Sequence, residues 1–297
     1  MLNKYPAARV PLMLGFLIVV WGLNWPLSKL ALHYTPPLLF AGIRTLIGGL
    51  VLLLFALRKR EQLRFRQNWP LYLISALLNI VCFYGLQTVG LGYLPSGLFS
   101  SIVFLQPVLL GLFSWLWLGE AMYSMKVAGL VLGFVGVATI SAGAISQHVS
   151  TIGVVLALGT AVSWAFGAVY MKKTSHKVDS TWMVCLQLLM GGALLTAAGS
   201  ATESWAGIQW TGSFVGDLLF IAVFVIAFGW LTYFILMGSG EASKVGSFTF
   251  LIPLVSIFGS SLMMGEPITV NLVVGLLLVL VSICLVNIKP RALKTVS

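Results

Sequence analysis

The sequence predicts an all-α integral membrane protein whose ten transmembrane helices form two inverted five-helix repeats, with both termini in the cytoplasm. Three observations predict this fold: a composition too apolar for a water-facing surface, ten apolar runs of membrane-spanning length, and an internal repeat. Hydrophobic residues make up 59% of the 297 positions and charged residues 8%, and the mean hydropathy is +1.03. Because a water-soluble domain carries roughly a quarter charged residues, we expect the chain to lie in a lipid bilayer.

The apolar runs have the length of membrane-crossing helices. A helix needs about 20 apolar residues to cross a hydrocarbon core about 30 Å thick. Each run is too long for a barrel strand and lacks alternation, so helices are the expected element. The predicted spans are residues 11–32, 37–57, 70–90, 95–118, 126–144, 151–171, 181–200, 214–237, 244–264 and 268–287.

The basic residues predict the orientation. Fifteen of the 17 Lys and Arg residues lie before the first span, after the last, or in or at the edge of every second loop. By the positive-inside rule both termini are cytoplasmic. Topology thus accounts for the net charge of +10, and no nucleic-acid partner is expected. The two exceptions, Lys29 and Arg44, fall inside spans. The intervening loops, which hold no Lys or Arg, are residues 33–36, 90–94, 145–150, 201–213 and 265–267.

An internal repeat relates the two halves of the chain. Residues 101–120 read SIVFLQPVLLGLFSWLWLGE, and residues 247–266 read SFTFLIPLVSIFGSSLMMGE. The segments IRTLIGG at 43–49 and LQLLMGG at 186–192 also match. These matches are in the same order in both halves, which indicates a duplication.

The duplication predicts two repeats, residues 1–145 and 150–290, with five spans each. An odd number of spans makes the second repeat enter the membrane from the opposite side. Inverted repeats with a site near the midplane at their interface are a recurrent architecture of secondary transporters.

With two five-helix repeats, each carrying a Pro-containing fourth helix and a trailing Gly-Glu, the chain resembles the ten-helix EamA-type branch of the drug/metabolite transporter superfamily. The resemblance covers essentially the whole chain and implies transport of small metabolites, often export of amino acids, without an ATP-binding domain. We therefore expect a secondary transporter that exports amino acids or related carboxylate-bearing compounds by alternating access. It is expected in the bacterial inner membrane as a monomer or weak homodimer, with no cofactor and no metal.

Two other function classes fit the sequence less well. A multidrug or organic-cation efflux transporter would want a membrane-embedded carboxylate, and no Asp or Glu lies in the middle of a predicted span. An integral membrane enzyme acting on lipid-linked substrates would need a nucleophile, an acid–base pair or a metal cluster near one interface. The His, Asp, Glu and Cys residues are instead scattered. The missing acids also argue against a carboxylate-based proton relay.

Arg44 is the sharpest single candidate for substrate binding. It lies about seven residues, or about 10 Å at 1.5 Å per residue, below the outer end of its span. A charge at that depth usually faces a cavity or a partner, and a positive charge suits a carboxylate. The alternatives are snorkelling to the outer interface or a structural hydrogen-bond hub. Its repeat partner is the neutral Gln187, so the charge belongs to one half only.

The segment WGLNWP at 21–26 is the second candidate. One broad helix face is predicted to hold Trp21, Asn24, Trp25 and Ser28, and the Asn24 amide can both donate and accept. Pro26 removes a backbone donor and can kink the helix. The alternative is that the tryptophans pack between helices and Asn24 bonds across them.

Other polar and aromatic groups near the middle of spans complete the predicted substrate-binding set. Gln106 is favoured because its repeat partner is the apolar Ile252. Gln87 is a further polar group in the third span, although it is not included in the set. The remaining members are Asn79, Tyr84, Trp164, Gln187, Trp230 and Tyr233.

The repeated motif itself predicts gating and structural roles. Pro107 and Pro253 lie near the middle of equivalent spans, where a bend in each copy could serve gating or define the fold. Glu120 and Glu266 follow these spans, and each is predicted to cap the N-terminus of the next helix in the chain, where a carboxylate complements exposed amides.

Overall fold

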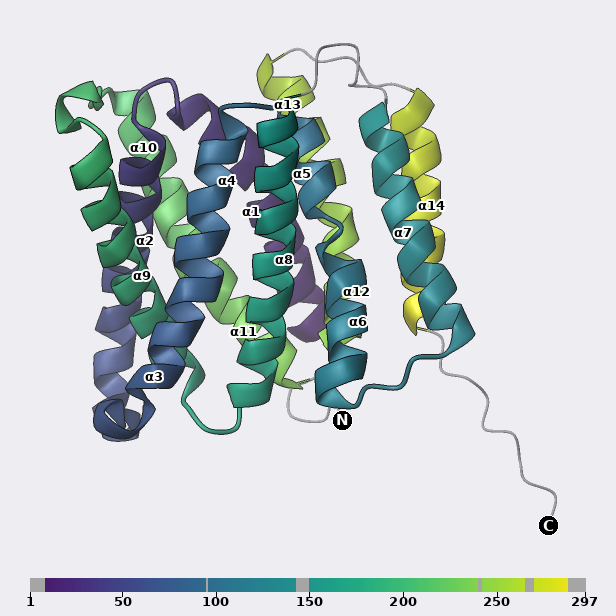
Figure 1. The fold of residues 1–297 in the computed structure, drawn as a ribbon, viewed down its shortest axis with the longest axis horizontal. Coiled ribbons are helices and arrows are strands. Elements are labelled where there is room, and N and C mark those ends of the chain that lie inside the picture. The colour runs from purple at the N-terminus through teal and green to yellow at the C-terminus, as the bar shows by residue number, and fades with distance from the viewer. Residues whose placement is uncertain (1–8, 95, 143–149, 240–241, 265–269, 288–297) are drawn as a thin grey trace.

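The computed structural model describes residues 9–94, 96–142, 150–239, 242–264 and 270–287, and every regular element in these ranges is helical. Figure 1 shows the main helices as rods that run side by side along a common axis. In chain order the elements are α1 (Arg9–Ala31), α2 (Pro37–Ala56), η1 (Leu57–Gln62), α3 (Phe65–Ala76), η2 (Leu77–Cys82), α4 (Phe83–Leu91), α5 (Ser96–Val103), α6 (Gln106–Leu118), α7 (Ser124–Ala142), α8 (Thr151–Thr174), α9 (Ser180–Thr202), η3 (Trp205–Gly207), α10 (Gly212–Phe220), η4 (Ile221–Phe228), α11 (Gly229–Ser239), α12 (Ala242–Phe248), η5 (Thr249–Leu251), α13 (Ile252–Met264) and α14 (Val270–Asn287).

Local sequence signals start several of these helices. The Ser150 hydroxyl accepts a hydrogen bond from the Gly153 amide at the start of α8. Asp179 accepts from the first amides of α9, and Thr211 does the same for α10. Pro37 stands in the first turn of α2, where its missing N–H is not needed. Ser150, Asp179 and Thr211 thus accept hydrogen bonds from amides that no helical carbonyl can reach.

Seven helical segments of the described chain are long and apolar enough to cross a membrane. Three further apolar helices are shorter, at Gln106–Leu118, Ser124–Gly136 and Val273–Asn287. The all-helical membrane architecture therefore agrees with the sequence, while ten crossings and the orientation of the termini stay predictions. The seven segments are Arg9–Ala31, Pro37–Gln62, Phe65–Leu91, Thr151–Thr174, Ser180–Thr202, Gly212–Ser239 and Val245–Met263.

The distribution of side chains is that of a protein solvated by lipid. Large apolar side chains such as Leu54 and Leu262 are exposed, at 68% and 88%. Polar side chains such as Arg44, Gln87 and Gln106 are fully buried. Because hydrocarbon solvates apolar groups and cannot hydrogen-bond, the polar groups gather inside the bundle.

Helices of the two halves pack in equivalent pairs. α2 packs against α9 and α7 against α14, while α1 packs against α13 and α8 against α6. Figure 1 shows the α7–α14 pair at one side of the bundle. A Cβ atom built on Gly133 of α7 would lie 2.5 Å from the Ser282 hydroxyl of α14. The glycines of α7 therefore serve close packing within the bundle.

Two pairs of elements depart from regular α-helix at equivalent places. The segments η2 and η4 are π-helical and lie between α3 and α4 and between α10 and α11. The α5–α6 segment breaks at a turn before Gln106, and η5 interrupts the matching α12–α13 segment before Ile252. Irregular backbone at membrane depth is tolerated where it is buried in protein or lines a cavity.

Lys29, one of the two basic residues inside a predicted span, is half-buried at the end of α1. Its ammonium group donates to the backbone carbonyls of Leu91 and Leu94, the latter at 3.3 Å. It therefore satisfies carbonyl groups at the C-terminus of α4, where a cation is favourable.

Candidate substrate pocket

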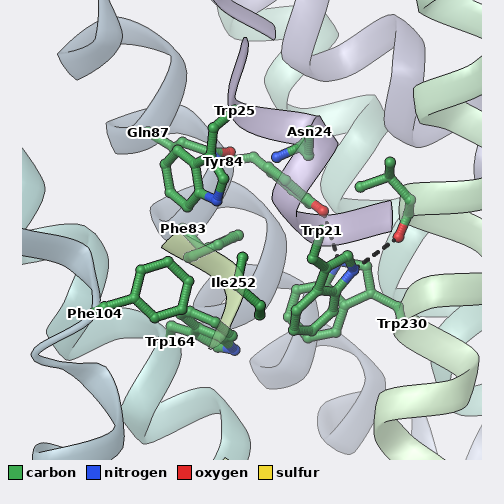
Figure 2. A pocket seen from close by; sticks show the side chains of 11 residues that line it. Trp21, Asn24, Trp25, Phe83, Tyr84, Gln87, Phe104, Trp164, Trp230 and Ile252 are labelled. Atoms are coloured by element: carbon green, nitrogen blue, oxygen red, sulfur yellow. Dashed lines mark hydrogen bonds between the residues drawn. The ribbon is translucent and has the colours of Figure 1, made fainter. Parts of the chain in front are cut away.

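A pocket with mainly aromatic walls lies inside the bundle (Figure 2). It holds about 310 Å³ of space not occupied by protein atoms. Its walls come from α1, α4, α8, η4, α11 and α13 and from the turn between α5 and α6. The lining residues are Trp21, Asn24, Trp25, Phe83, Tyr84, Gln87, Phe104, Trp164, Val225, Trp230 and Ile252.

The aromatic walls form one continuous cluster around Trp21. The ring of Trp21 lies 5.4 Å from Trp164, 5.7 Å from Trp230 and 5.0 Å from Tyr233, all in tilted or edge-on geometry. Phe83 extends the cluster, 5.3 Å from Trp164. Such offset arrangements are favourable for aromatic pairs, and they give the pocket apolar walls from both halves of the chain.

Hydrogen bonds hold two of the indole rings. Trp21 Nε1 donates to the carbonyl of Val225, in the π-helical η4, at 3.1 Å. Trp230 Nε1 donates to the Tyr84 hydroxyl at 2.7 Å, as the dashed lines in Figure 2 show. These bonds orient both rings and take up their N–H groups.

Arg44 lies directly behind the pocket wall. Its guanidinium is fully buried, donates to Ser28 Oγ at 2.8 Å and to Gln87 Oε1 at 3.2 Å, and lies 4.6 Å from the ring centres of Phe40 and Tyr84. It therefore does not extend to the outer interface. Among the residues that the structure describes, no acidic side chain forms an ion pair with it.

Gln187, the repeat partner of Arg44, lies in a second polar cluster. Its carbonyl oxygen accepts from Ser75 Oγ and from Asn79 Nδ2, the latter at 3.4 Å. The Asn79 carbonyl oxygen lies only 1.9 Å from where a Cβ atom on Gly167 would be. None of these four residues lines the pocket, so this cluster connects α3 and η2 to α8 and α9.

Comparison with known proteins identifies the family. The model of the EamA-like transporter family matches residues 10–142 and 151–288. The chain belongs to this family. It is an EamA-type transporter of the drug/metabolite transporter superfamily, in agreement with the sequence resemblance. The assignment points to a multi-pass membrane transporter rather than an enzyme.

Individual relatives cover nearly the whole transporter. The uncharacterized transporter YvbV of Bacillus subtilis is 63% identical over 99% of this chain and 96% of its own length. The probable amino-acid metabolite efflux pumps of Salmonella typhimurium and Escherichia coli are 29% and 28% identical, over 90% and 85% of this chain and 92% and 86% of their own. One solved crystal structure matches the fold with a TM-score of 0.80 at 20% identity, over 95% of this chain and 97% of the other.

Six of the predicted substrate-binding residues of this transporter meet at the pocket. Of the four residues predicted to share a face of α1, Trp21, Asn24 and Trp25 line the pocket and Ser28 does not. The other three that line it are Tyr84, Trp164 and Trp230. The five predicted residues outside the lining are Arg44, Asn79, Gln106, Gln187 and Tyr233.

Gln106 and Tyr233 are buried close to this aromatic core without lining the pocket. The Tyr233 hydroxyl lies close to the Gln106 amide and to the Trp164 indole, and both groups interact with it. The Tyr233 ring packs on Trp21 at 5.0 Å. Tyr233 therefore supports the wall through its ring.

Five lining residues were outside the predicted set. Phe83 and Val225 are apolar residues in apolar spans, which sequence alone does not separate from core or lipid-facing positions. One signal could have found Phe104 and Ile252: both lie within the repeated segments, one to three positions before the proline, and broken helices tend to line cavities. Gln87 was a recognisable polar group one helical turn beyond Tyr84.

The predicted gating prolines stand at breaks between helices. Pro107 lies in the first turn of α6 and Pro253 in the first turn of α13, each just after an interruption of its span. Pro26 lies inside α1, which is assigned as helix from Arg9 to Ala31.

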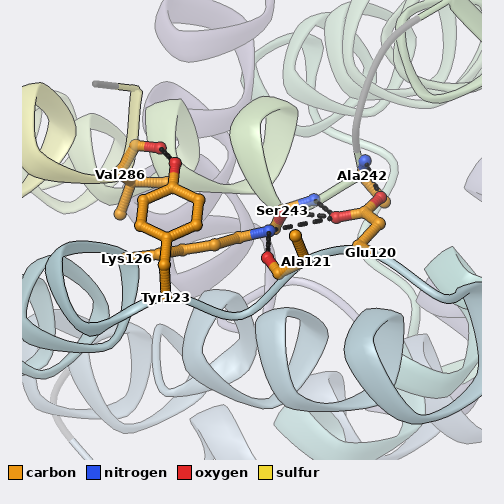
Figure 3. Close-up of polar contacts among 7 residues, drawn as sticks. All are labelled: Glu120, Ala121, Tyr123, Lys126, Ala242, Ser243 and Val286. Carbon is orange, nitrogen blue, oxygen red and sulfur yellow. Dashed lines mark hydrogen bonds and ion pairs between the residues drawn. The ribbon is translucent and has the colours of Figure 1, made fainter. Parts of the chain in front are cut away.

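Glu120 caps a helix, but the prediction of which helix was wrong. Its carboxylate accepts from the backbone amide of Ala242 at 2.6 Å and from the amide and hydroxyl of Ser243, at the start of α12 in the other half (Figure 3). The fully buried Lys126 pairs with it at 3.4 Å. The three-dimensional arrangement brings unsatisfied amides of α12 closer than those of the next helix in the chain. Glu266 lies outside the described residues.

Proposed function

We propose that the chain is a secondary transporter that exports small carboxylate-bearing metabolites, amino acids among them, across the bacterial plasma membrane. The observation that carries the proposal is an aromatic pocket beside a buried arginine that has no acidic partner in the described ranges. Apolar walls with a few placed polar groups are typical of small-molecule sites. The names of the two efflux-pump relatives agree with this substrate class.

We propose alternating access as the mechanism. In this proposal the halves 1–145 and 150–290 are inverted five-helix repeats with ten crossings in total and cytoplasmic termini. The equivalent pairing of α2 with α9 and of α7 with α14 supports it, as do the matching breaks before Pro107 and Pro253. Rocking of one repeat against the other around a midplane site would expose the pocket alternately to each side.

A transporter of organic cations is the second candidate. The aromatic walls favour it, because tryptophan and tyrosine rings attract cations. The positive charge of Arg44 immediately behind the wall opposes it, because a desolvated charge acts strongly at short range in a low dielectric.

Counterflow in proteoliposomes tests the proposal. Purified protein is assayed with a panel of amino acids, organic acids and organic cations, with Arg44→Gln beside the wild type. We expect counterflow of carboxylate-bearing compounds in the wild type and its loss in the variant. Counterflow of cations alone, or carboxylate counterflow that survives Arg44→Gln unchanged, would contradict the proposal.

The same vesicles test the coupling. Because no acid lies in the middle of a predicted span, we expect flux without stoichiometric proton exchange. A pH indicator inside the vesicles should stay constant during transport, and a pH change proportional to flux would contradict this expectation.

A further inference from the structure

The orientation of Gln87 follows from its contact with Arg44. A guanidinium group carries five N–H donors and no acceptor. The Gln87 atom that faces Arg44 at 3.2 Å must therefore be the carbonyl oxygen. The amide nitrogen of Gln87 is then turned away from Arg44. It is buried and has no hydrogen-bond partner among the described residues, while its side chain lines the pocket.

Asn24 is oriented through Ser28 by the same arginine. Ser28 Oγ accepts from Arg44 at 2.8 Å and donates to Asn24 Oδ1 at 3.1 Å. The bond from Ser28 goes to the carbonyl oxygen of Asn24, and the NH₂ group of Asn24 takes no part in it. Asn24 also lines the pocket, and in Figure 2 its nitrogen lies on the side of Tyr84.

We infer that the amides of Asn24 and Gln87 together form the binding site for the carboxylate of the substrate. Arg44 is a positioning residue in this arrangement. It donates directly to the carbonyl oxygen of Gln87, and through Ser28 it fixes the carbonyl oxygen of Asn24. The NH₂ groups of both amides then remain for the ligand. This inference rests on the proposed transport function and changes the role of Arg44 from direct contact to action through its neighbours.

The charge distribution supports an anionic ligand. Arg44 is fully buried, and no described acidic residue pairs with it. A buried charge without a counter-charge is costly. A carboxylate held by the two amides would accept hydrogen bonds from both and lie next to this positive charge. The apolar part of the same ligand would contact the tryptophan rings.

Ligand binding to the full-length protein in detergent tests the inference without requiring transport. Three probes share one phenylpropyl skeleton: 3-phenylpropionate is an anion with two acceptor oxygens, 3-phenylpropanamide is neutral with one, and 3-phenylpropylamine is a cation with none. Because four tryptophans line the pocket, intrinsic fluorescence reports binding. We expect the anion to bind most tightly and the cation most weakly.

Three variants examine the amides and the arginine. Gln87→Met removes the donor at similar volume, and we expect the preference for the anion over the cation to fall about tenfold. Gln87→Glu gives Arg44 a carboxylate partner and should reverse the preference. Arg44→Gln should lower the preference for the anion over the cation, as Gln87→Met does. When Gln87→Met is already present, adding Arg44→Gln should change this preference much less than it does in the wild type, because the effects of coupled residues are not additive.

Gln187→Met is the matched control, since Gln187 is a buried amide whose neighbours do not line the pocket. It should leave the ratio of affinities unchanged, whereas a loss of folded protein lowers the fluorescence amplitude for all three probes together. The inference would be overturned by equal affinities for the three probes, by no binding of any probe, or by an effect of Arg44→Gln that is as large in the Gln87→Met background as in the wild type. These outcomes are read from binding in detergent and are separate from the counterflow outcomes in vesicles that would contradict the proposed function.

Discussion

Arg44 and Gln187 occupy equivalent positions in the matching segments 43–49 and 186–192, yet their side chains have different neighbours. Both side chains are fully buried. Arg44 bonds to Gln87, which lines the aromatic pocket, and Gln187 bonds to Ser75 and Asn79, which do not. One cluster is charged and adjoins the pocket, whereas the other is neutral and lies between packed helices.

The difference shows that burial at membrane depth does not by itself identify a binding residue. Both clusters hydrogen-bond polar groups that lipid cannot solvate, and both leave some buried polar atoms without a described partner. What separates them is whether such an atom belongs to a side chain that lines the pocket. The amide nitrogen of Gln87 is such an atom. The carbonyl oxygen of Asn79 instead lies in close contact with Gly167, away from the pocket.

The largest expected effect comes from moving the charge between the two clusters. The double variant Arg44→Gln with Gln187→Arg keeps one buried arginine at an equivalent depth. We expect carboxylate counterflow to fall about a hundredfold, as for Arg44→Gln alone, because charged hydrogen bonds at the pocket are lost. The arginine at 187 has no neighbour that reaches the pocket. If the double variant recovered carboxylate counterflow, the depth of the arginine in the membrane, and not its contact with the pocket wall, would decide transport. The contrast between the Arg44 and Gln187 clusters would then fail.

A second variant disrupts the neutral cluster through packing. Gly167→Ala places a Cβ atom within 1.9 Å of the Asn79 carbonyl oxygen. We expect overpacking to cost about 1–3 kcal/mol, measured as a lower unfolding temperature in detergent. Gly216→Ala is the control, because a Cβ atom there meets nothing within 4 Å. Equal unfolding temperatures for the two variants would contradict the close contact.

The third prediction concerns a polar group that holds the pocket wall. Tyr84→Phe removes the acceptor of the Trp230 indole, 2.7 Å away, and leaves a buried N–H group unpaired. We expect a loss of about 1–2 kcal/mol in stability, together with weaker binding of the aromatic probes. Tyr170→Phe serves as the control, since the Tyr170 hydroxyl has no hydrogen-bond partner among the described residues. A loss of the same size in both variants would argue against the role of Tyr84.

The smallest effect is expected at the neutral cluster itself. Ser75→Ala removes the hydrogen bond that Ser75 donates to Gln187 and the one that it accepts from Asn79, whose amide keeps its bond to Gln187. We expect a cost of about 1 kcal/mol, with substrate preference unchanged. Thermal unfolding and the counterflow panel measure the two quantities on the same preparation. A changed preference would assign Gln187 to the substrate path and remove the contrast with Arg44.

Much of the pocket follows from the sequence because helix geometry is local. The spacing of Trp21, Asn24 and Trp25 places them on one face, and that face does line the pocket. The chemistry of Glu120 as a helix cap was also predictable from residue type, while its target was not. A carboxylate caps whichever exposed amides the fold brings near, and here these belong to Ala242 and Ser243, more than 100 positions away.

By itself the sequence determined the class of protein, its membrane helices, its internal repeat and most of the aromatic positions in the pocket. These depend on composition and on periodicity within single helices. Only the tertiary structure decided that Phe83 and Val225 join the wall and that Arg44 lies behind Gln87. In a membrane helix both the lipid face and the packed face are apolar, so the pattern of hydrophobicity does not tell them apart. Contacts between distant helices therefore decide which polar groups keep a free donor at the pocket.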